Sequence, residues 1–424
     1  MSNRLANIGL LVTVFLLLGA SPGADDATLR GLIDEALKNS PEIQASTARI
    51  EAAKYRVPQA GSLPDPMFMF GYQNEGFDRY SYGQEQGSQW MFSATQQFLF
   101  PGKRTLKEDM VKRDVEGMES MHELLKHKTT ARVKELYFDL FLAYRNIELL
   151  QDKRNVFARI EELTTARYAA GKAMQQEVLM AQTEKYMLLE KEEMLKQKIQ
   201  SQEAMMSAIL GRQKADVLPK PSEPAYKVFS LSAEEAVDMA LARSPEIKYR
   251  SKMIEAAEVK EMMAKREYFP DLAIGAGYYN RSGDFKDMWS ATATINIPLY
   301  FLTKQKPAVA EARANISSAR QELAAVKLMI AAAVRDNYSM LRSSEKLMDI
   351  YKSALIPKNS QDLEQALTNY STGKADASAV ISRLKTLLDY ETLYWGQFVE
   401  REKAIARLHA IAAQFDQPAG GENK

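Results

Sequence analysis

The feature that most constrains the fold of this chain is an internal repeat. Four short segments recur about two hundred residues later in the same order: 40–43 at 244–247, 50–53 at 254–257, 63–65 at 269–271, and 168–172 at 370–374. One such match could arise by chance in helical sequence. An ordered set, with separations of 204, 204, 206 and 202 residues, indicates a duplicated structural unit and internal pseudo-symmetry.

Composition narrows the classes of function that the chain can have. Its 424 residues are 46% hydrophobic, which is enough for a large core, and the formal charge is only +1. A nucleic-acid partner is not expected, because phosphate binding needs a concentrated basic face. There is no cysteine, so disulfides, thiolate nucleophiles and cysteine-ligated metals are excluded.

The N-terminus has the pattern of a secretory signal peptide, which we assign to residues 1–24. Arg4 precedes an apolar run from Ile8 to Leu18, and small or turn-forming residues follow from Gly19 to Ala24. The run is shorter than the ~20 residues that a membrane-spanning helix needs. No later stretch has 18 consecutive apolar residues, so a membrane role of the mature chain would use strands.

The repeat divides the mature chain into two units with the same plan. We expect the first structural repeat over residues 25–211 and the second over 231–414. A proline-rich linker at 212–230 joins them, and a polar tail occupies 415–424.

Each unit is predicted to open with a helix, at Thr28–Gln59 and at Ser232–Tyr268. The dipeptides Pro64-Asp65 and Pro270-Asp271 follow them. Proline lacks a backbone donor and disfavours the helical conformation of the residue before it, so these elements mark the ends of the opening helices.

A β-hairpin is predicted next in each unit, at residues 67–99 and 272–298. In the segment from Ser290 to Pro298, alanine and isoleucine alternate with threonine and asparagine. The strands have about 8–11 residues, the length that a tilted strand needs to cross a bilayer. Two such hairpins taken alone would also suit a small soluble β-subdomain.

Two very long helices are predicted after the hairpins, from Gly102 to about Ala166 and from Lys304 to about Asn369. Each would be roughly 100 Å long at 1.5 Å per residue. Their apolar positions step alternately by three and four residues, which is the period of a coiled-coil seam. The seam residues are Val133, Leu136, Leu140, Ala143, Ile147 and Leu150 in the first helix, and Val309, Ala312, Ile316, Ala319, Leu323, Val326, Ile330 and Ala333 in the second. Pro357 is expected to kink or interrupt the second helix.

A glycine turn ends each long helix, and return helices are expected at Gln175–Leu210 and from Ser378 to about Ala413. The two hairpins supply four strands per chain, too few to close a membrane barrel. The smallest such barrels have about eight strands, because lipid offers no partner to an open edge. We therefore predict an oligomer of two, three or four chains. The predicted fold class is an internally duplicated α+β membrane protein, in which a long α-helical coiled-coil barrel joins a transmembrane β-barrel shared between protomers.

Local motifs accompany this plan. They include Ser40–Ile43 with its partner Ser244–Ile247, and Gln176–Gln182 after the first turn. With the duplicated plan, these motifs resemble the TolC-like outer-membrane efflux proteins along nearly the whole mature chain. Phe100–Lys103 and Leu63–Pro66 are similar to the branch paired with heavy-metal efflux pumps of the RND type.

The resemblance implies a homotrimer in the outer membrane of a Gram-negative bacterium, with a twelve-stranded barrel and a helical tunnel through the periplasm. It implies a periplasmic adaptor protein and an inner-membrane pump as partners, and outer-membrane lipid around the barrel. The channel would be passive, conducting metal ions or small toxic compounds that the pump supplies. Two alternatives remain open: the exit duct of a type I protein-secretion system, and a periplasmic coiled-coil scaffold or adaptor without a barrel.

The resemblance also places the adaptor contact at the turns that end the long helices. The residues concerned are Tyr168, Gly171, Lys172, Tyr370, Gly373 and Lys374. Family members often carry an acidic gate residue six positions past the turn glycine, where Glu177 stands in the first repeat. The second repeat has Ala379 there and Asp376 nearer the turn, so Glu177 and Asp376 are the candidate gate residues.

Other residues bear on membrane contact and on chemistry. Trp90 and Trp289 begin the second strand of each hairpin near the loops, which favours membrane-interface aromatics over core packing. The 21 methionines suit the filling of helical seams better than a soft-metal site, and the three histidines lack ligand spacing. No Ser/His/Asp arrangement, phosphate loop or carboxylate pair stands out. We therefore predict no catalytic, cofactor-binding or metal site, and a protein that is not an enzyme.

Overall fold

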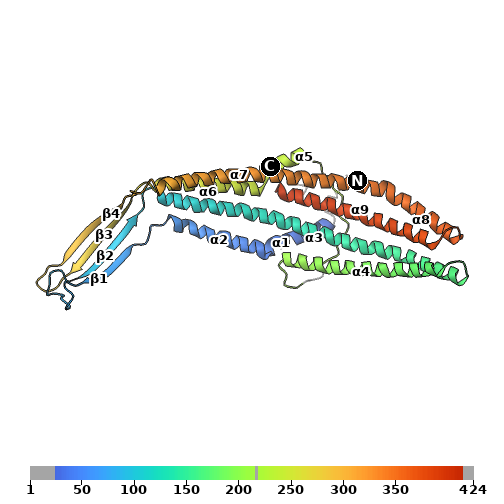
Figure 1. Ribbon diagram of the computed structural model, residues 1–424, viewed down its shortest axis with the longest axis horizontal. Coiled ribbons are helices and arrows are strands. Elements are labelled where there is room, and N and C mark those ends of the chain that lie inside the picture. Colours follow the sequence, from blue (N-terminus) through green and yellow to red (C-terminus); the bar gives the residue numbers. More distant parts are fainter. Residues whose placement is uncertain (1–23, 215–217, 414–424) are drawn as a thin grey trace, which may run out of the picture.

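The computed structural model describes residues 24–214 and 218–413. Figure 1 shows an elongated molecule with a sheet at one end, helices along its length and two helical hairpin turns at the other end. The predicted signal peptide and polar tail lie outside the described residues, apart from Ala24, which begins the first helix. Within the described part of the chain, no helix combines the length and the apolar character needed to span a membrane.

The same order of elements occurs twice along the chain. The first half contains α1 (Ala24–Asn39), α2 (Pro41–Gly61), β1 (Met67–Gln73), β2 (Gln89–Phe98), α3 (Lys103–Ala169) and α4 (Gln175–Ile209). The second half contains α5 (Ala233–Arg243), α6 (Pro245–Arg266), β3 (Asp271–Asn280), β4 (Met288–Asn296), α7 (Gln305–Ile350), η1 (Tyr351–Leu355), α8 (Ile356–Ser371) and α9 (Ala377–Ile411). The strands, long helices and return helices lie within a few residues of the positions that the sequence predicts.

The opening helix of each half is in fact a pair of helices. The break falls at Ser40 and at Ser244, whose backbones are extended (φ −56°, ψ 123° and φ −53°, ψ 125°). A proline follows each serine. It disfavours helical geometry in the serine, yet suits the first turn of the next helix, where no N–H is needed. The prediction of one continuous helix over Thr28–Gln59 and another over Ser232–Tyr268 is therefore wrong.

The two hairpins form one antiparallel sheet with the strand order β1-β2-β3-β4. Its central pair joins the two halves of the chain: Trp90 of β2 lies opposite Asn280 of β3, and Phe98 lies opposite Leu272. β1 and β4 are the edges, and neither has a second partner strand among the described residues. One chain therefore presents a sheet with two open edges.

The second long helix is interrupted where the sequence predicts it. A π-helical turn, η1, separates α7 from α8, and Pro357 lies in the first turn of α8. Proline has no N–H to donate to the preceding turn, and the wider π turn accommodates it. The first half has no such interruption. Its long helix, α3, runs without a break through 67 residues.

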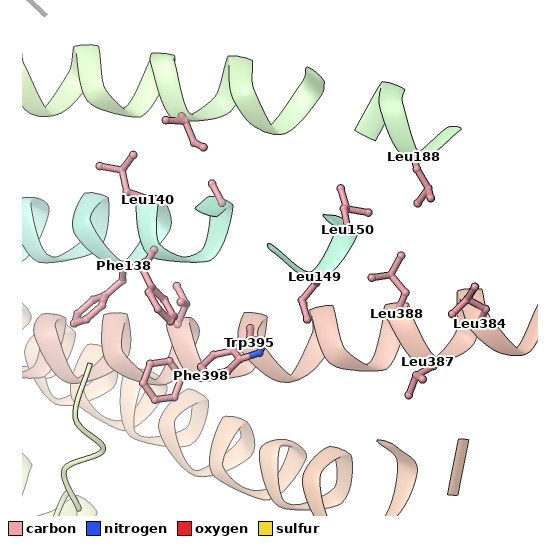
Figure 2. Close-up of a cluster of buried hydrophobic side chains, with 14 of the residues drawn as sticks. Phe138, Leu140, Leu149, Leu150, Leu188, Leu384, Leu387, Leu388, Trp395 and Phe398 are labelled. Atoms are coloured by element: carbon pink, nitrogen blue, oxygen red, sulfur yellow. The ribbon is translucent and has the colours of Figure 1, made fainter. Parts of the chain in front are cut away.

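The largest apolar core lies where α3 packs against α4 and α9. Figure 2 shows Leu140 and Leu150 on the side of α3 that faces α4, whereas Phe138 and Leu149 point toward α9. On α9, the ring of Trp395 lies 5.6 Å from that of Phe141 and 5.7 Å from that of Phe398. The middle of α3 is therefore buried on two sides.

The predicted seams match the buried sides of the long helices, with one departure. On α7, Val309, Ala312, Ile316 and Ile330 are buried as expected. The next buried position is Val334 (1% exposed) rather than Ala333. Two successive steps of four residues form a stutter, which locally unwinds a coiled coil and moves the contact to the neighbouring position.

A buried ion pair joins the helices to the sheet. Lys103, the first residue of α3, is 2% exposed, and its Nζ lies 2.9 Å from Oδ1 of Asp271 at the start of β3. The same ammonium donates to the carbonyl of Phe269 at 3.0 Å. Asp271 also accepts the backbone N–H of Phe100 at 2.8 Å. The first half of the chain thereby holds the beginning of the second hairpin.

Replacing Lys103 by methionine should destabilise this junction, because Asp271 and the Phe269 carbonyl then lose a buried partner. Removing one member of a buried ion pair costs about 3 kcal/mol. The midpoint of thermal unfolding of the detergent-solubilised protein should fall by several degrees. Lys112→Met, which changes a lysine further along α3 that makes no such buried pair, should leave the midpoint unchanged. Equal midpoints in the two variants would show that the ion pair does not stabilise the junction.

Candidate functional site

The pairing register gives the sheet one apolar face. Residues directly opposite each other in neighbouring strands share a face, so Phe70, Phe92, Tyr278 and Trp289 lie together. The other members are Phe68, Tyr72, Trp90, Ala94, Phe98, Leu272, Ile274, Ala276, Ala291, Ala293 and Ile295, with Gln96 and Asn280 as the polar exceptions. Phe68 is 80% exposed and Trp289 is 81% exposed. Aromatic and aliphatic groups exposed over a whole sheet face are typical of a surface that contacts lipid.

The opposite face carries hydroxyl, amide, thioether and very small side chains. Its members include Met67, Met69, Gly71, Met91, Ser93, Thr95, Gly275, Gly277, Met288, Ser290, Thr292 and Thr294. This alternation of apolar and polar faces is the pattern of strands that separate lipid from water.

The two tryptophans lie on the apolar face at the end of the sheet next to the loops. Trp90 stacks on Phe70 at 5.2 Å and contacts Tyr72 at 4.9 Å. Trp289 lies opposite Tyr278 in the neighbouring strand. The register therefore brings the two residues singled out in the sequence to the same face and nearly the same level.

At the other end of the molecule, each long helix ends in a glycine turn (Figure 1). Gly171 and Gly373 have φ angles of 70° and 79°, in the left-handed region that glycine adopts without strain. The backbone N–H of Lys172 donates to the carbonyl of Arg167 at 2.8 Å, and that of Lys374 to the carbonyl of Asn369 at 2.8 Å. Both turns thus have the same helix-ending motif, and both glycines are exposed.

The two turn tyrosines have different surroundings. Tyr168 is 46% exposed, whereas Tyr370 is 1% exposed. The hydroxyl of Tyr370 donates to Oγ1 of Thr164 at 2.9 Å. The guanidinium of Arg167 lies 4.7 Å over the Tyr370 ring and donates to its carbonyl. Thr164 and Arg167 belong to α3, so these contacts join the ends of the two hairpins within one chain.

Glu177 also spans the two hairpin ends. Its Oε1 accepts the backbone N–H of Met174 at 3.3 Å, and its Oε2 accepts that of Ala377 at 3.0 Å. These N–H groups lie at the beginnings of α4 and α9, where the helix dipole favours a carboxylate. The candidate gate residue of the first repeat is therefore held between two helix N-termini.

Asp376, the other candidate gate residue, caps α9. Its Oδ1 accepts the backbone N–H of Ala379 and the hydroxyl of Ser378, both at 2.9 Å. These hydrogen bonds, chiefly that from the Ala379 backbone, lower the pKa of the Asp376 carboxyl. The carboxylate is exposed beside the turn and keeps its negative charge at neutral pH.

The sequence analysis missed Thr164 and Arg167. A signal for Thr164 exists in the repeat, because it aligns with Ala366 at the offset that brings Tyr168 onto Tyr370. Arg167 aligns with Asn369, which is also polar, and gives no such signal. Positions where one repeat carries a hydrogen-bonding side chain and the other does not mark contacts that only one half makes. The sequence analysis used this signal for Glu177 but not for Thr164.

Metal-ligand chemistry is sparse in the part of the chain that the structure describes. No group of three or more histidine, aspartate or glutamate side chains there could hold a metal ion. Nδ1 of His122 lies 3.1 Å from Oγ of Ser46. Burial lowers the pKa of both His122 and His127.

Comparison with known proteins identifies the family. The sequence profile described as outer membrane efflux protein matches residues 32–212 and 236–386, which is more than half of the chain and one segment in each half. The chain belongs to the outer membrane efflux protein family. It is an outer-membrane efflux channel, as the sequence predicts.

Individual relatives are similar to this chain over most of its length. The pyoverdine export outer membrane protein OpmQ of Pseudomonas putida is 22% identical over 421 residues, 95% of this chain and 87% of that protein. The nickel-cobalt-cadmium resistance protein NccC of Alcaligenes xylosoxydans xylosoxydans is 23% identical over 336 residues, 77% and 73% of the two chains. The crystal structure of the outer membrane protein VceC of Vibrio cholerae matches with a TM-score of 0.77 and 19% identity, over 91% of this chain and 96% of that one. The predicted fold class is confirmed.

Replacing Tyr370 by phenylalanine should loosen the contact between the hairpin ends, because the hydroxyl bond to buried Thr164 is lost. Such a loss costs about 1–2 kcal/mol. Hydrogen exchange of the amides at residues 164–172 should therefore become about tenfold faster. Tyr168→Phe is the matched control, since that ring is exposed, and it should leave these rates unchanged. Equal rates in the two variants would contradict a link through Tyr370.

Proposed function

We propose that this protein is the exit duct of a tripartite efflux system. It conducts substrates passively from an inner-membrane pump and a periplasmic adaptor to the outside of the cell. The observation that carries this proposal is the arrangement of the molecule: a two-faced sheet at one end and exposed glycine turns at the other. Between them lies a continuous helix of about 100 Å, long enough to cross much of the periplasm.

The working unit is a homotrimer. The edges of β1 and β4 are unpaired within the described chain, and an open edge is not tolerated in lipid. Pairing β4 of one protomer with β1 of the next closes a ring of twelve strands. α7 supports the same assembly, because Leu328 and Met329 are exposed on its surface and offer apolar area to a neighbouring chain.

The aromatic residues at the loop end of the sheet, Trp90 and Trp289, lie at the membrane interface. Tryptophan is enriched there because its ring contacts the acyl region while its N–H remains near water. The exposure of Trp289 and the stacking of Trp90 on the apolar face support this role.

The adaptor docks on the exposed turns, with Tyr168, Gly171, Lys172, Gly373 and Lys374 as contact residues. Tyr370 has a different task from the one that the family resemblance implies. Because its ring and hydroxyl are buried against α3, it supports the second turn from inside.

Glu177 holds the closed end together and gates it, and Asp376 places a negative charge beside the second turn. The support for this role is the pair of hydrogen bonds that Glu177 accepts from α4 and α9. Tyr370→Phe weakens the same closed end. Besides the faster hydrogen exchange, it should therefore raise the conductance of the channel.

The substrates are metal ions, metal complexes or small toxic compounds. Support comes from the names of two relatives, one for nickel, cobalt and cadmium resistance and one for pyoverdine export. Selection among substrates takes place mainly in the pump.

Native mass and conductance test the proposal directly. The protein purified in detergent should have the mass of three chains, and it should form conducting pores in planar bilayers. A monomer that remains soluble without detergent, or a trimer that never conducts, would refute the duct.

The turns can be tested separately from the barrel. Replacing both Gly171 and Gly373 by valine should abolish efflux and leave membrane insertion intact, because a β-branched residue is strained at positive φ. A Cβ added at Gly171 would meet nothing within 4 Å, so the effect would come from the backbone. Gly396→Val on α9, which has the same open space and no positive φ, should retain efflux. Loss of insertion in the double variant would contradict this division of tasks.

A further inference from the structure

We infer that the part of the duct at the level of the membrane does not discriminate between cations and anions. The inference rests on the proposed function, because it takes the polar face of the sheet as the wall of a passage. It concerns the residues of that wall, which set what the outer segment of the duct admits.

The strands are almost free of charge. The four strands together contain a single ionisable acid or base of the Asp, Glu, Lys or Arg type, which is Asp271. It lies at the helical end of β3, and its carboxylate faces the ammonium of Lys103 at 2.9 Å. That one charge is therefore compensated within the protein.

The wall presents hydroxyl groups close to the backbone. A Cβ on Gly275 would lie 2.7 Å from Oγ1 of Thr292 and 3.0 Å from Oγ1 of Thr95. Glycine at this position leaves room for the two hydroxyls from the strands on either side. Thr292 also donates to the Gly275 carbonyl at 3.4 Å.

Such a lining serves ions of both signs. A hydroxyl can donate to an anion or accept from a hydrated cation, and it can rotate to suit either. The thioethers of Met67 and Met69 carry no charge on the same face. A ring of carboxylates or of lysines, by contrast, would favour one sign of charge.

Charged residues reappear only where the strands end. The loop of residues 74–88 contains Glu75, Asp78, Arg79 and Glu85, and that of residues 281–287 contains Arg281, Asp284, Lys286 and Asp287. The change in composition follows the limits of the strands. Metal cations and anionic metal complexes therefore pass this section alike, so that any preference for charge arises at the loops, at the closed end or in the pump.

The absence of cysteine from the chain allows a direct test. Ser93 and Ala94 are neighbours on β2 that belong to opposite faces. Ser93→Cys and Ala94→Cys are reconstituted separately in lipid vesicles. Each is treated with a cationic and an anionic methanethiosulfonate of similar size. The ratio of the two reaction rates cancels differences in the amount of thiolate.

Ser93→Cys should react with both reagents, with a rate ratio within about twofold of that for a small thiol in solution, as an uncharged wall requires. Adding Thr95→Asp to Ser93→Cys should raise the ratio in favour of the cation by about fivefold or more. A ratio that departs about tenfold from the free thiol in Ser93→Cys alone would overturn the inference. An unchanged ratio in the Thr95→Asp variant would overturn it as well, because the wall charge would then have no influence.

Ala94→Cys separates this inference from the proposed function. It should react with neither reagent, because its side chain faces lipid. If it reacts as fast as Ser93→Cys, the sheet does not divide lipid from water and the duct itself is refuted. Ala94→Cys could instead remain unreactive while Ser93→Cys reacts preferentially with the reagent of one charge. In that case the proposed duct is retained, and only the inference of a passage without charge preference is refuted.

Discussion

The uninterrupted helix α3 is the constraint on which the rest of the structure depends. It contacts α2 and α6 toward the sheet and α4 and α9 toward the turns. Its first residue, Lys103, binds the start of β3, and its last turns supply Thr164 and Arg167 to Tyr370. Because the α-helix has a fixed rise per residue, its 67 residues set the distance between the sheet and the glycine turns.

The second half of the chain follows the same plan but is not equivalent. Its long helix is interrupted by η1, and its turn rests on α3 through the buried ring of Tyr370. Ion pairs extend this contact along the hairpins: Lys385 lies 2.8 Å from Glu184, and Lys153 lies 3.0 Å from Glu391. The first half supplies an uninterrupted frame, and the second half is joined to it by the apolar core between α3 and α9 and by these polar contacts.

Much of the fold could be predicted because its signals are local. The alternation in Ser290–Pro298 and the seam from Val309 to Ile330 are periodicities that can be recognised within one element. The errors also have local causes. A proline at a helix start and a proline that breaks a helix look the same in sequence, which hid the break at Ser40. A regular three-and-four spacing in the sequence does not show where a stutter occurs. Ala333 was therefore predicted to be buried, whereas the structure buries Val334.

The sequence by itself determined the duplication, the strands and their two-faced character, the long seams and the glycine turns. Only the tertiary structure decided how the two halves meet. It placed Trp90 and Trp289 on one face through the pairing of β2 with β3, buried Tyr370 while leaving Tyr168 exposed, and put Glu177 between two helix N-termini. The physical reason is separation along the chain. The hydrogen bonds of Lys103 to Asp271, Glu177 to Ala377 and Tyr370 to Thr164 join residues 168, 200 and 206 positions apart, and no local period specifies such a contact.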